Sequence, residues 1–202
     1  MSPRIADLVS GWPASPFARL ADPAWTIVSR ASRRVSALLA GLSEDYRIEG
    51  EIAVHDSARI ETGAVVKGPA IIGPGCLIAA GAYLRGGVWL DRDCVVGPGS
   101  ELKSSLVFAG SKLAHFNFVG DSILGADVNL EAGAVIANHR NERADKTIRL
   151  LWEGGVVDTG TDKFGALVGD GARIGANAVV APGAVLPRAA VVPRLGLIDQ
   201  SP

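Results

Sequence analysis

An apolar residue recurs at every sixth position from residue 48 to residue 114. The positions of this series are Ile48, Val54, Ile60, Val66, Ile72, Ile78, Leu84, Leu90, Val96, Leu102, Phe108 and Ala114. Helices repeat about every 3.6 residues and strands about every 2, so neither produces this spacing. A six-residue period is typical of a solenoid of short parallel strands. We therefore predict that these residues point inward and that three six-residue units form each triangular coil.

Small residues stand four places after most of these apolar positions, where the chain would bend at a corner. They are Ala58, Ala64, Ala70, Cys76, Ala82, Cys94 and Ser100. The two cysteines are 94 − 76 = 18 residues apart, which is one full coil. We expect them to stack in adjacent coils as buried thiols, with a disulfide as the less favoured alternative.

The six-residue register changes twice further along the chain. The gap from Ala114 to Leu124 is ten residues, which predicts a bulge of about four residues around 116–120. The period resumes at Leu124, stops for an insert at 139–166, and returns from Val168 to Val192. The pair Gly154-Gly155 inside the insert predicts a hairpin turn. The repeats give roughly six to seven coils, stacked about 4.8 Å apart.

The first 45 residues lack the six-residue period. Ile27, Val28, Val35, Leu38 and Leu39 fall on one side of a helix that Gly41 would end. Ile5, Leu8 and Val9 indicate a shorter helix before it. We expect an all-β chain with a short N-terminal helical segment at 1–45, followed by a solenoid domain at 46–195 that carries the insert.

Composition and charge limit the kinds of partner that we expect this protein to bind. Hydrophobic residues make up 48% of the 202 residues and aromatic residues only 5%, which suits a thin aliphatic core. The net charge of −1 gives no basic face, so we expect no nucleic-acid partner. No signal peptide and no apolar run of about 18 residues stands out, so we expect no membrane partner and a cytoplasmic location. Flat solenoid sides are buried most simply in a homotrimer.

Three cations follow the inward positions at intervals of one coil. Lys67, Arg85 and Lys103 are 85 − 67 = 18 and 103 − 85 = 18 residues apart. They should leave the same edge of the prism, where like charges repel. A phosphate dianion would relieve that repulsion, and arginine offers paired donors for it. The alternative is a solvated row of charges without a ligand.

His115 is a candidate general base, since an unperturbed imidazole titrates near pH ~6.5. The expected bulge would expose its ring, and Glu101 at the corner would hold it in one tautomer. The alternative is a structural histidine. A zinc site of the carbonic-anhydrase kind is not expected, because His55, His115 and His139 are separated by 60 and 24 residues, with no close pair. We therefore predict no metal.

Several runs of this sequence together resemble a known enzyme family. They are residues 101–103, 110–121, 128–129, 138, 157–160 and 163–165. Over about residues 48–190 the chain resembles the acetyltransferase half of bifunctional N-acetylglucosamine-1-phosphate uridylyltransferase/glucosamine-1-phosphate acetyltransferase. The resemblance implies a single-stranded left-handed parallel β-helix. It also implies acetyl-CoA as acyl donor and an amino-sugar phosphate as acceptor.

The resemblance assigns roles to matching residues. Arg85 and Lys103 would hold the sugar 1-phosphate. His115 would take a proton from the sugar amine, with Glu101 orienting it. The remaining residues would contact either the amino sugar (Asn129, Asn138 and His139) or the acetyl-CoA (Ala132, Lys163 and Ala176). The amine would attack the thioester directly, without an acyl-enzyme.

Three positions depart from the family pattern. Phe118 and His139 stand where the family has phenols, and Ala176 stands where it has a serine. Residues 1–45 are too few for a nucleotidyltransferase domain, so we expect no uridylyl transfer. The sequence thus predicts a CoA-dependent N-acyltransferase acting on an amino-sugar phosphate such as glucosamine 1-phosphate. The alternatives are a sugar-phosphate-binding protein without activity and an acyltransferase for another amine or hydroxyl.

Overall fold

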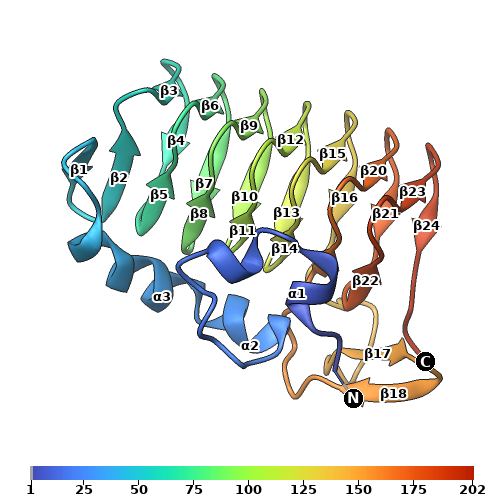
Figure 1. The fold of residues 1–202 in the computed structure, drawn as a ribbon. Coiled ribbons are helices and arrows are strands. Elements are labelled where there is room, and N and C mark those ends of the chain that lie inside the picture. Colours follow the sequence, from blue (N-terminus) through green and yellow to red (C-terminus); the bar gives the residue numbers. More distant parts are fainter. Residues whose placement is uncertain (1) are drawn as a thin grey trace.

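Three parallel sheets form the sides of a triangular left-handed β-helix in the computed structural model, which describes residues 2–202 (Figure 1). Side A consists of β1 (Tyr46–Glu49), β2 (Ile52–His55), β5 (Ala70–Ile72), β8 (Val88–Leu90), β11 (Leu106–Val107), β14 (Ile123–Leu124), β19 (Ala166–Val168) and β22 (Ala184–Leu186). Side B consists of β3 (Arg59–Ile60), β6 (Leu77–Ile78), β9 (Val95–Val96), β12 (Lys112–Leu113), β15 (Asn129–Leu130), β20 (Arg173–Ile174) and β23 (Val191–Val192). Side C consists of β4 (Val65–Val66), β7 (Tyr83–Arg85), β10 (Glu101–Lys103), β13 (Phe118–Gly120), β16 (Val135–Ile136), β21 (Val179–Val180) and β24 (Leu197–Ile198). The predicted fold class is confirmed.

The aliphatic core fills the inside of the prism, as the six-residue period predicts. Ile72, Ile78 and Leu84, from one coil, are fully buried and lie on sides A, B and C. Cys76 and Cys94 lie in the same core as free thiols, and the neighbouring Cys76 thiol together with burial raises the pKa of Cys94. The prediction of unpaired cysteines is confirmed.

Three of the twelve predicted inward positions are wrong. Ile48 lies on β1, which pairs antiparallel with β2, and its side chain is 46% exposed. The first parallel coil therefore begins at Ile52. Phe108 points outward and contacts Trp12 and Trp89, and Leu113 rather than Ala114 takes the inward position on side B.

The change of register is made by two short corners rather than by a bulge. Leu102 pairs with Val119 and Val107 with Leu124, so each of these coils has 17 residues instead of 18. The expected four-residue bulge at 116–120 is wrong, because Phe118–Gly120 form β13 and residues 116–117 belong to the ordinary corner before it. The missing residue is lost at the corner that leads from side C to side A.

Buried serines stabilise the two short corners. Ser105 Oγ donates to the carbonyl of Lys103 at 2.7 Å and accepts the N–H of Ser122 at 3.0 Å. Ser122 Oγ repeats the arrangement with Gly120 O and Ala166 N. A hydroxyl thus satisfies backbone groups that a shorter corner would leave unpaired.

The N-terminal segment covers the outer face of side A. It comprises α1 (Ile5–Leu8), η1 (Trp12–Ala14), α2 (Ala24–Ser29), α3 (Ala31–Leu38) and η2 (Leu39–Gly41). Side A is apolar on both faces, and its outward Ile71, Trp89 and Leu167 form a second core with Trp12 and Trp25. The single helix expected before Gly41 is broken at Arg30, where φ is −112°. Phe108 belongs to this second core, which explains why an apolar residue that was predicted to face inward faces outward instead.

The insert folds as the hairpin β17 (Arg149–Trp152) and β18 (Gly155–Asp158), which lies beside the chain termini in Figure 1. Its turn is Glu153-Gly154, with φ of +47° and +76°, one residue earlier than expected. Leu150 joins the second core, and the N–H of Leu151 donates to Gln200 O at 2.8 Å. The hairpin is therefore held against its own chain. In the part of the chain that the structure describes, no helix has the length and hydrophobicity to cross a membrane.

Candidate functional site

Lys67, Arg85 and Lys103 form one column at the corner between sides C and A. Arg85 and Lys103 are register partners on β7 and β10, and the N–H of Lys67 donates to Leu84 O at 2.8 Å. Successive members are thus about 4.8 Å apart along the axis. Residues 18 apart therefore stack in this column, as the phosphate hypothesis requires.

Each cation of this column has a partner within the chain. Lys103 Nζ lies 2.6 Å from Asp121 Oδ2, and Arg85 contacts Glu101 Oε1 at 2.7 Å. Lys67 Nζ lies 5.3 Å from the centre of the Tyr83 ring. Three cations and two carboxylates leave a net charge of 3 − 2 = +1. The repulsion between the cations is therefore offset without a ligand, while the column retains a weak attraction for anions.

Asp121 organises this corner and was given no role in the sequence analysis. Its carboxylate is buried, accepts from Asn138 Nδ2, and holds Lys103 at the same oxygen. Its backbone has φ of +46°, a conformation that favours glycine, asparagine and aspartate. A Cβ on the neighbouring Gly120 would collide with the Asn138 amide, so the close approach of Asn138 requires glycine there. In the sequence, the dipeptide Gly120-Asp121 was the feature that could have indicated this corner.

His115 lies at the other end of side C, at its corner with side B. Its ring is exposed, and no side-chain hydrogen bond to it is present among residues 2–202. The N–H of Gly133 donates to His115 O at 2.9 Å, and the N–H of Asn177 donates to Ala132 O at 3.0 Å. His115, Ala132 and Ala176 therefore stack in one column along the axis.

The two columns do not meet within one chain. Gly120, the register partner of Lys103, follows His115 by five residues, which comprise the corner at Phe116, where φ is +52°, and then β13, which crosses side C. Glu101 is bonded to Arg85 rather than to His115, so the expected orienting pair is absent from this chain. The structure places the cation and the imidazole at opposite ends of side C.

Of the other site residues, three lie at the corner of sides C and A, and Asn129 lies on the outer face of side B. Asn138, His139 and Lys163 lie at the corner of sides C and A, where the N–H of Phe164 donates to Asn138 O at 3.1 Å. His139 Nδ1 lies 2.9 Å from Asp162 O, and Lys163 is exposed. Lys163 is thus grouped with the cations rather than with Ala132 and Ala176.

Asn129 points outward from side B, in register with Lys112 and Arg173. It lines a depression of about 330 Å³ together with Glu131 and Arg194. Hydrogen bonds from Arg194 and from the N–H of Ala176 hold the pKa of Glu131 below its usual value. Glu131 therefore remains an anion next to the His115 column. Nowhere in residues 2–202 do three histidine, cysteine or acidic side chains gather as metal ligands.

The fold and the repeat define a hexapeptide-repeat β-helix protein. Residues 51–86 and 69–104 match the family model described as bacterial transferase hexapeptide (six repeats). These residues form the first three coils, where the six-residue period is unbroken.

The chain is similar to curated bifunctional proteins, one of which has an acetyltransferase in its name. It is 34% identical over 131 residues to the bifunctional sugar-1-phosphate nucleotidylyltransferase/acetyltransferase of Sulfurisphaera tokodaii, covering 65% of this chain and 32% of that protein. It is 33% identical over 152 residues to the bifunctional protein GlmU of Methanococcus maripaludis, covering 72% of this chain and 36% of that protein. The chain spans about a third of the length of these relatives. The resemblance found in the sequence is confirmed.

Proposed function

We propose that this protein is a CoA-dependent N-acyltransferase related to the sugar-phosphate acetyltransferases, with acetyl-CoA as donor and an amino-sugar phosphate such as glucosamine 1-phosphate as acceptor. The name of the Sulfurisphaera tokodaii relative, which includes an acetyltransferase, supports the class of reaction. The observation that carries the proposal is the position of the two residue groups at opposite ends of side C on neighbouring coils. In a cyclic homotrimer with side C of each chain toward the three-fold axis, the corner of sides C and A of one chain would lie against the corner of sides B and C of the next.

In such a cleft, each of the two chains supplies residues with a different role. One chain supplies Arg85 and Lys103 for the phosphate, with Asp121 fixing the lysine and Asn138 against it. The other supplies the exposed His115 and the column of Ala132 and Ala176, whose small side chains leave room for an extended thiol ester. Both substrates then reach the same imidazole.

Chemistry at the cleft needs one base and one anion anchor. His115 removes a proton from the acceptor amine as the amine nitrogen bonds to the thioester carbonyl carbon. The C–S bond then breaks, and the protonated imidazole returns the proton to the departing thiolate. The column anchors the phosphate by exchanging the Arg85–Glu101 contact for an Arg85–phosphate contact.

Thiol release tests the proposal. Purified protein is incubated with acetyl-CoA and glucosamine 1-phosphate, and free CoA thiol is measured with time. His115→Ala should lower kcat by about 10²–10⁴-fold, the range for loss of a general base. His55→Ala is the matched control, because its ring lies on side A, where it bonds to Ser57 and packs against Tyr46. Unchanged turnover in His115→Ala contradicts the assignment.

A sugar-phosphate-binding protein without catalysis is the second candidate. Phe118 lacks a phenol hydroxyl, and Glu101 is committed to Arg85 rather than to His115. Calorimetry separates the candidates, because this one binds glucosamine 1-phosphate but not acetyl-CoA. An acyltransferase for another acceptor would bind acetyl-CoA and release thiol only with a different amine or hydroxyl.

A further inference from the structure

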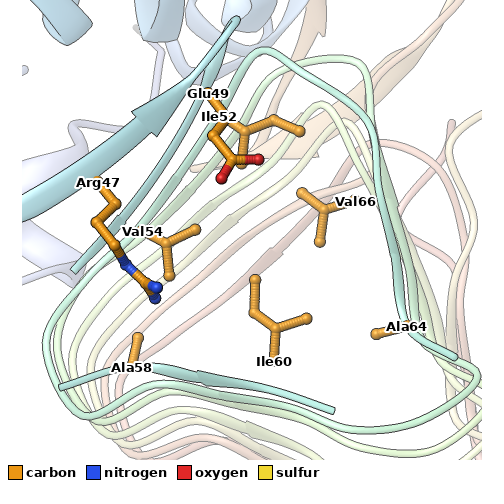
Figure 2. A pocket seen from close by; sticks show the side chains of 8 residues that line it. All are labelled: Arg47, Glu49, Ile52, Val54, Ala58, Ile60, Ala64 and Val66. Carbon is orange, nitrogen blue, oxygen red and sulfur yellow. The ribbon is translucent and has the colours of Figure 1, made fainter. Parts of the chain in front are cut away.

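The end of the β-helix that carries β1 is open. A cavity of about 330 Å³ is lined there by inward side chains of the first coil, with Arg47 and Glu49 of β1 standing over them (Figure 2). The aliphatic lining residues are Ile52, Val54, Ala58, Ile60, Ala64 and Val66. Buried Ile72, Ile78 and Leu84 fill the next coil, so the cavity is only about one strand spacing deep. Both chain termini lie at the other end of the molecule (Figure 1).

Strand β1 presents an unpaired edge at this end. It is the edge strand of side A, and among residues 2–202 its one strand partner is β2. The N–H of Asp56 donates to Asp45 O at 2.9 Å, so Asp45, Arg47 and Glu49 turn their backbone groups toward β2. Because alternate residues of an antiparallel strand face opposite neighbours, the N–H and C=O of Ile48 point to the free edge.

The side chains of β1 are complementary to a second β1 in the opposite direction. An antiparallel pair centred on Ile48 places Ile48 opposite Ile48 and Arg47 opposite Glu49, twice. Ile48 is 46% exposed, which is high for an aliphatic residue with nothing to pack against. Arg47 has only a loose 3.6 Å contact with Asp56, and both of those side chains are more than 60% exposed.

We propose that this end is an interface between two copies of the chain, in which the β1 strands pair antiparallel across a two-fold axis at Ile48. Two-fold interfaces use the same patch twice, so a patch that holds both charges of an ion pair is suited to itself. The ladder gives the Ile48 backbone groups their partners, and the Arg47–Glu49 contacts fix its register. The two shallow apolar cavities then face one another. The pairing also removes an exposed strand edge.

The mass of the full-length protein in solution tests this interface. One chain is 20.8 kDa, and light scattering should find an even number of chains, six if the trimer is correct and two if it is not. Arg47→Glu and Glu49→Arg each place like charges opposite one another, and each should halve the mass. An equimolar mixture of the two variants should restore it, because a β1 strand with two acidic side chains then pairs with a β1 strand that carries two arginines.

Two further variants complete the experiment. Ile48→Pro removes the N–H at the two-fold axis and should halve the mass, while Arg4→Glu changes the charge equally on an exposed residue of the N-terminal segment and should leave the mass unchanged. Circular dichroism checks that each variant is folded. The interface is overturned by a wild-type mass of one or three chains, by charge variants that keep the even mass, or by a mixture that fails to restore it. Activity is measured separately, so failure here leaves the acyltransferase proposal standing.

Discussion

At the scale of single residues, the corner of sides C and A depends on one buried carboxylate. Asp121 is 4% exposed and holds both Lys103 and Asn138, so a cation and an amide from different coils share one anchor. Removing one partner of a buried charged pair leaves the other without compensation. The chemistry expected of Lys103 thus relies on a residue that itself need not touch the substrate.

Asp121→Asn should lower the free energy of unfolding by about 1–3 kcal/mol, because the Lys103 ammonium loses its counter-charge in a site that is largely closed to solvent. Urea denaturation measures this change. Asp127→Asn is the control, because its contact with Arg173 is exposed and should contribute less than about 1 kcal/mol. Equal effects of the two substitutions would contradict the anchoring role of Asp121.

The ion pair between Arg140 and Asp199 should make the stability of the fold depend on pH. The Arg140 guanidinium holds the pKa of Asp199 well below its usual value. A carboxyl group whose folded pKa is depressed stabilises the fold above its unfolded pKa of about 3.9, and that contribution disappears as the pH falls. Stability from this pair should be constant between pH 7 and 5 and should decrease below about pH 4.

Asp199→Asn should flatten that decrease, as measured by unfolding midpoints between pH 7 and 3. A wild-type profile and a variant profile that run parallel below pH 4 would contradict the contribution of the pair.

At the scale of elements, the short corners decide where the functional residues stand. Losing one residue after Lys103 and another after Gly120 is what places Asp121 over Ser104 and Asn138 over Asp121. The serine hydroxyls at these corners serve backbone groups of two coils at once. The cleft thus depends on turns as much as on strands.

Ser122→Ala should destabilise the fold by about 1–3 kcal/mol, since the buried N–H of Ala166 and the corner that precedes β14 lose their hydroxyl partner. Ser57→Ala is the comparison and should cost less, because the Ser57 hydroxyl bonds to His55 and accepts the N–H of Gly75 in an exposed corner, where water can replace it. Thermal unfolding of both variants decides the matter, and a neutral Ser122→Ala would show that the corner does not need the hydroxyl.

The sequence predicts these elements only where the period is regular. From Val54 to Leu102 every residue of the six-residue series faces inward, because each coil has the same length. At Phe108 the prediction fails, since an aromatic residue has a second core to enter and periodicity cannot distinguish the two. The short corners were also missed. The period alone does not distinguish two corners that are each one residue shorter from a single four-residue bulge. The columns of Lys103 and His115 follow from spacing, while their separation across side C requires the strand directions.

At the scale of the whole molecule, one side of the prism is covered and two are bare. The N-terminal segment and the insert cover side A, and sides B and C keep exposed aliphatic residues such as Val65 and Val191. A cyclic trimer in which side C of each chain faces the three-fold axis would bring one end of side C of each chain against the other end of side C of the next. The central claim is that the cation column and the imidazole act together only across that boundary.

Mixing two inactive variants tests this claim most directly. Lys103→Ala and His115→Ala are each expected to lose thiol release with acetyl-CoA and glucosamine 1-phosphate. When the two proteins are unfolded together and refolded as mixed assemblies, a shared site draws one corner from each chain. About one site in four is then wild type, so activity should return to about a quarter of the wild-type value. Recovery of that size supports a site between chains, and a mixed assembly that remains inactive would contradict it.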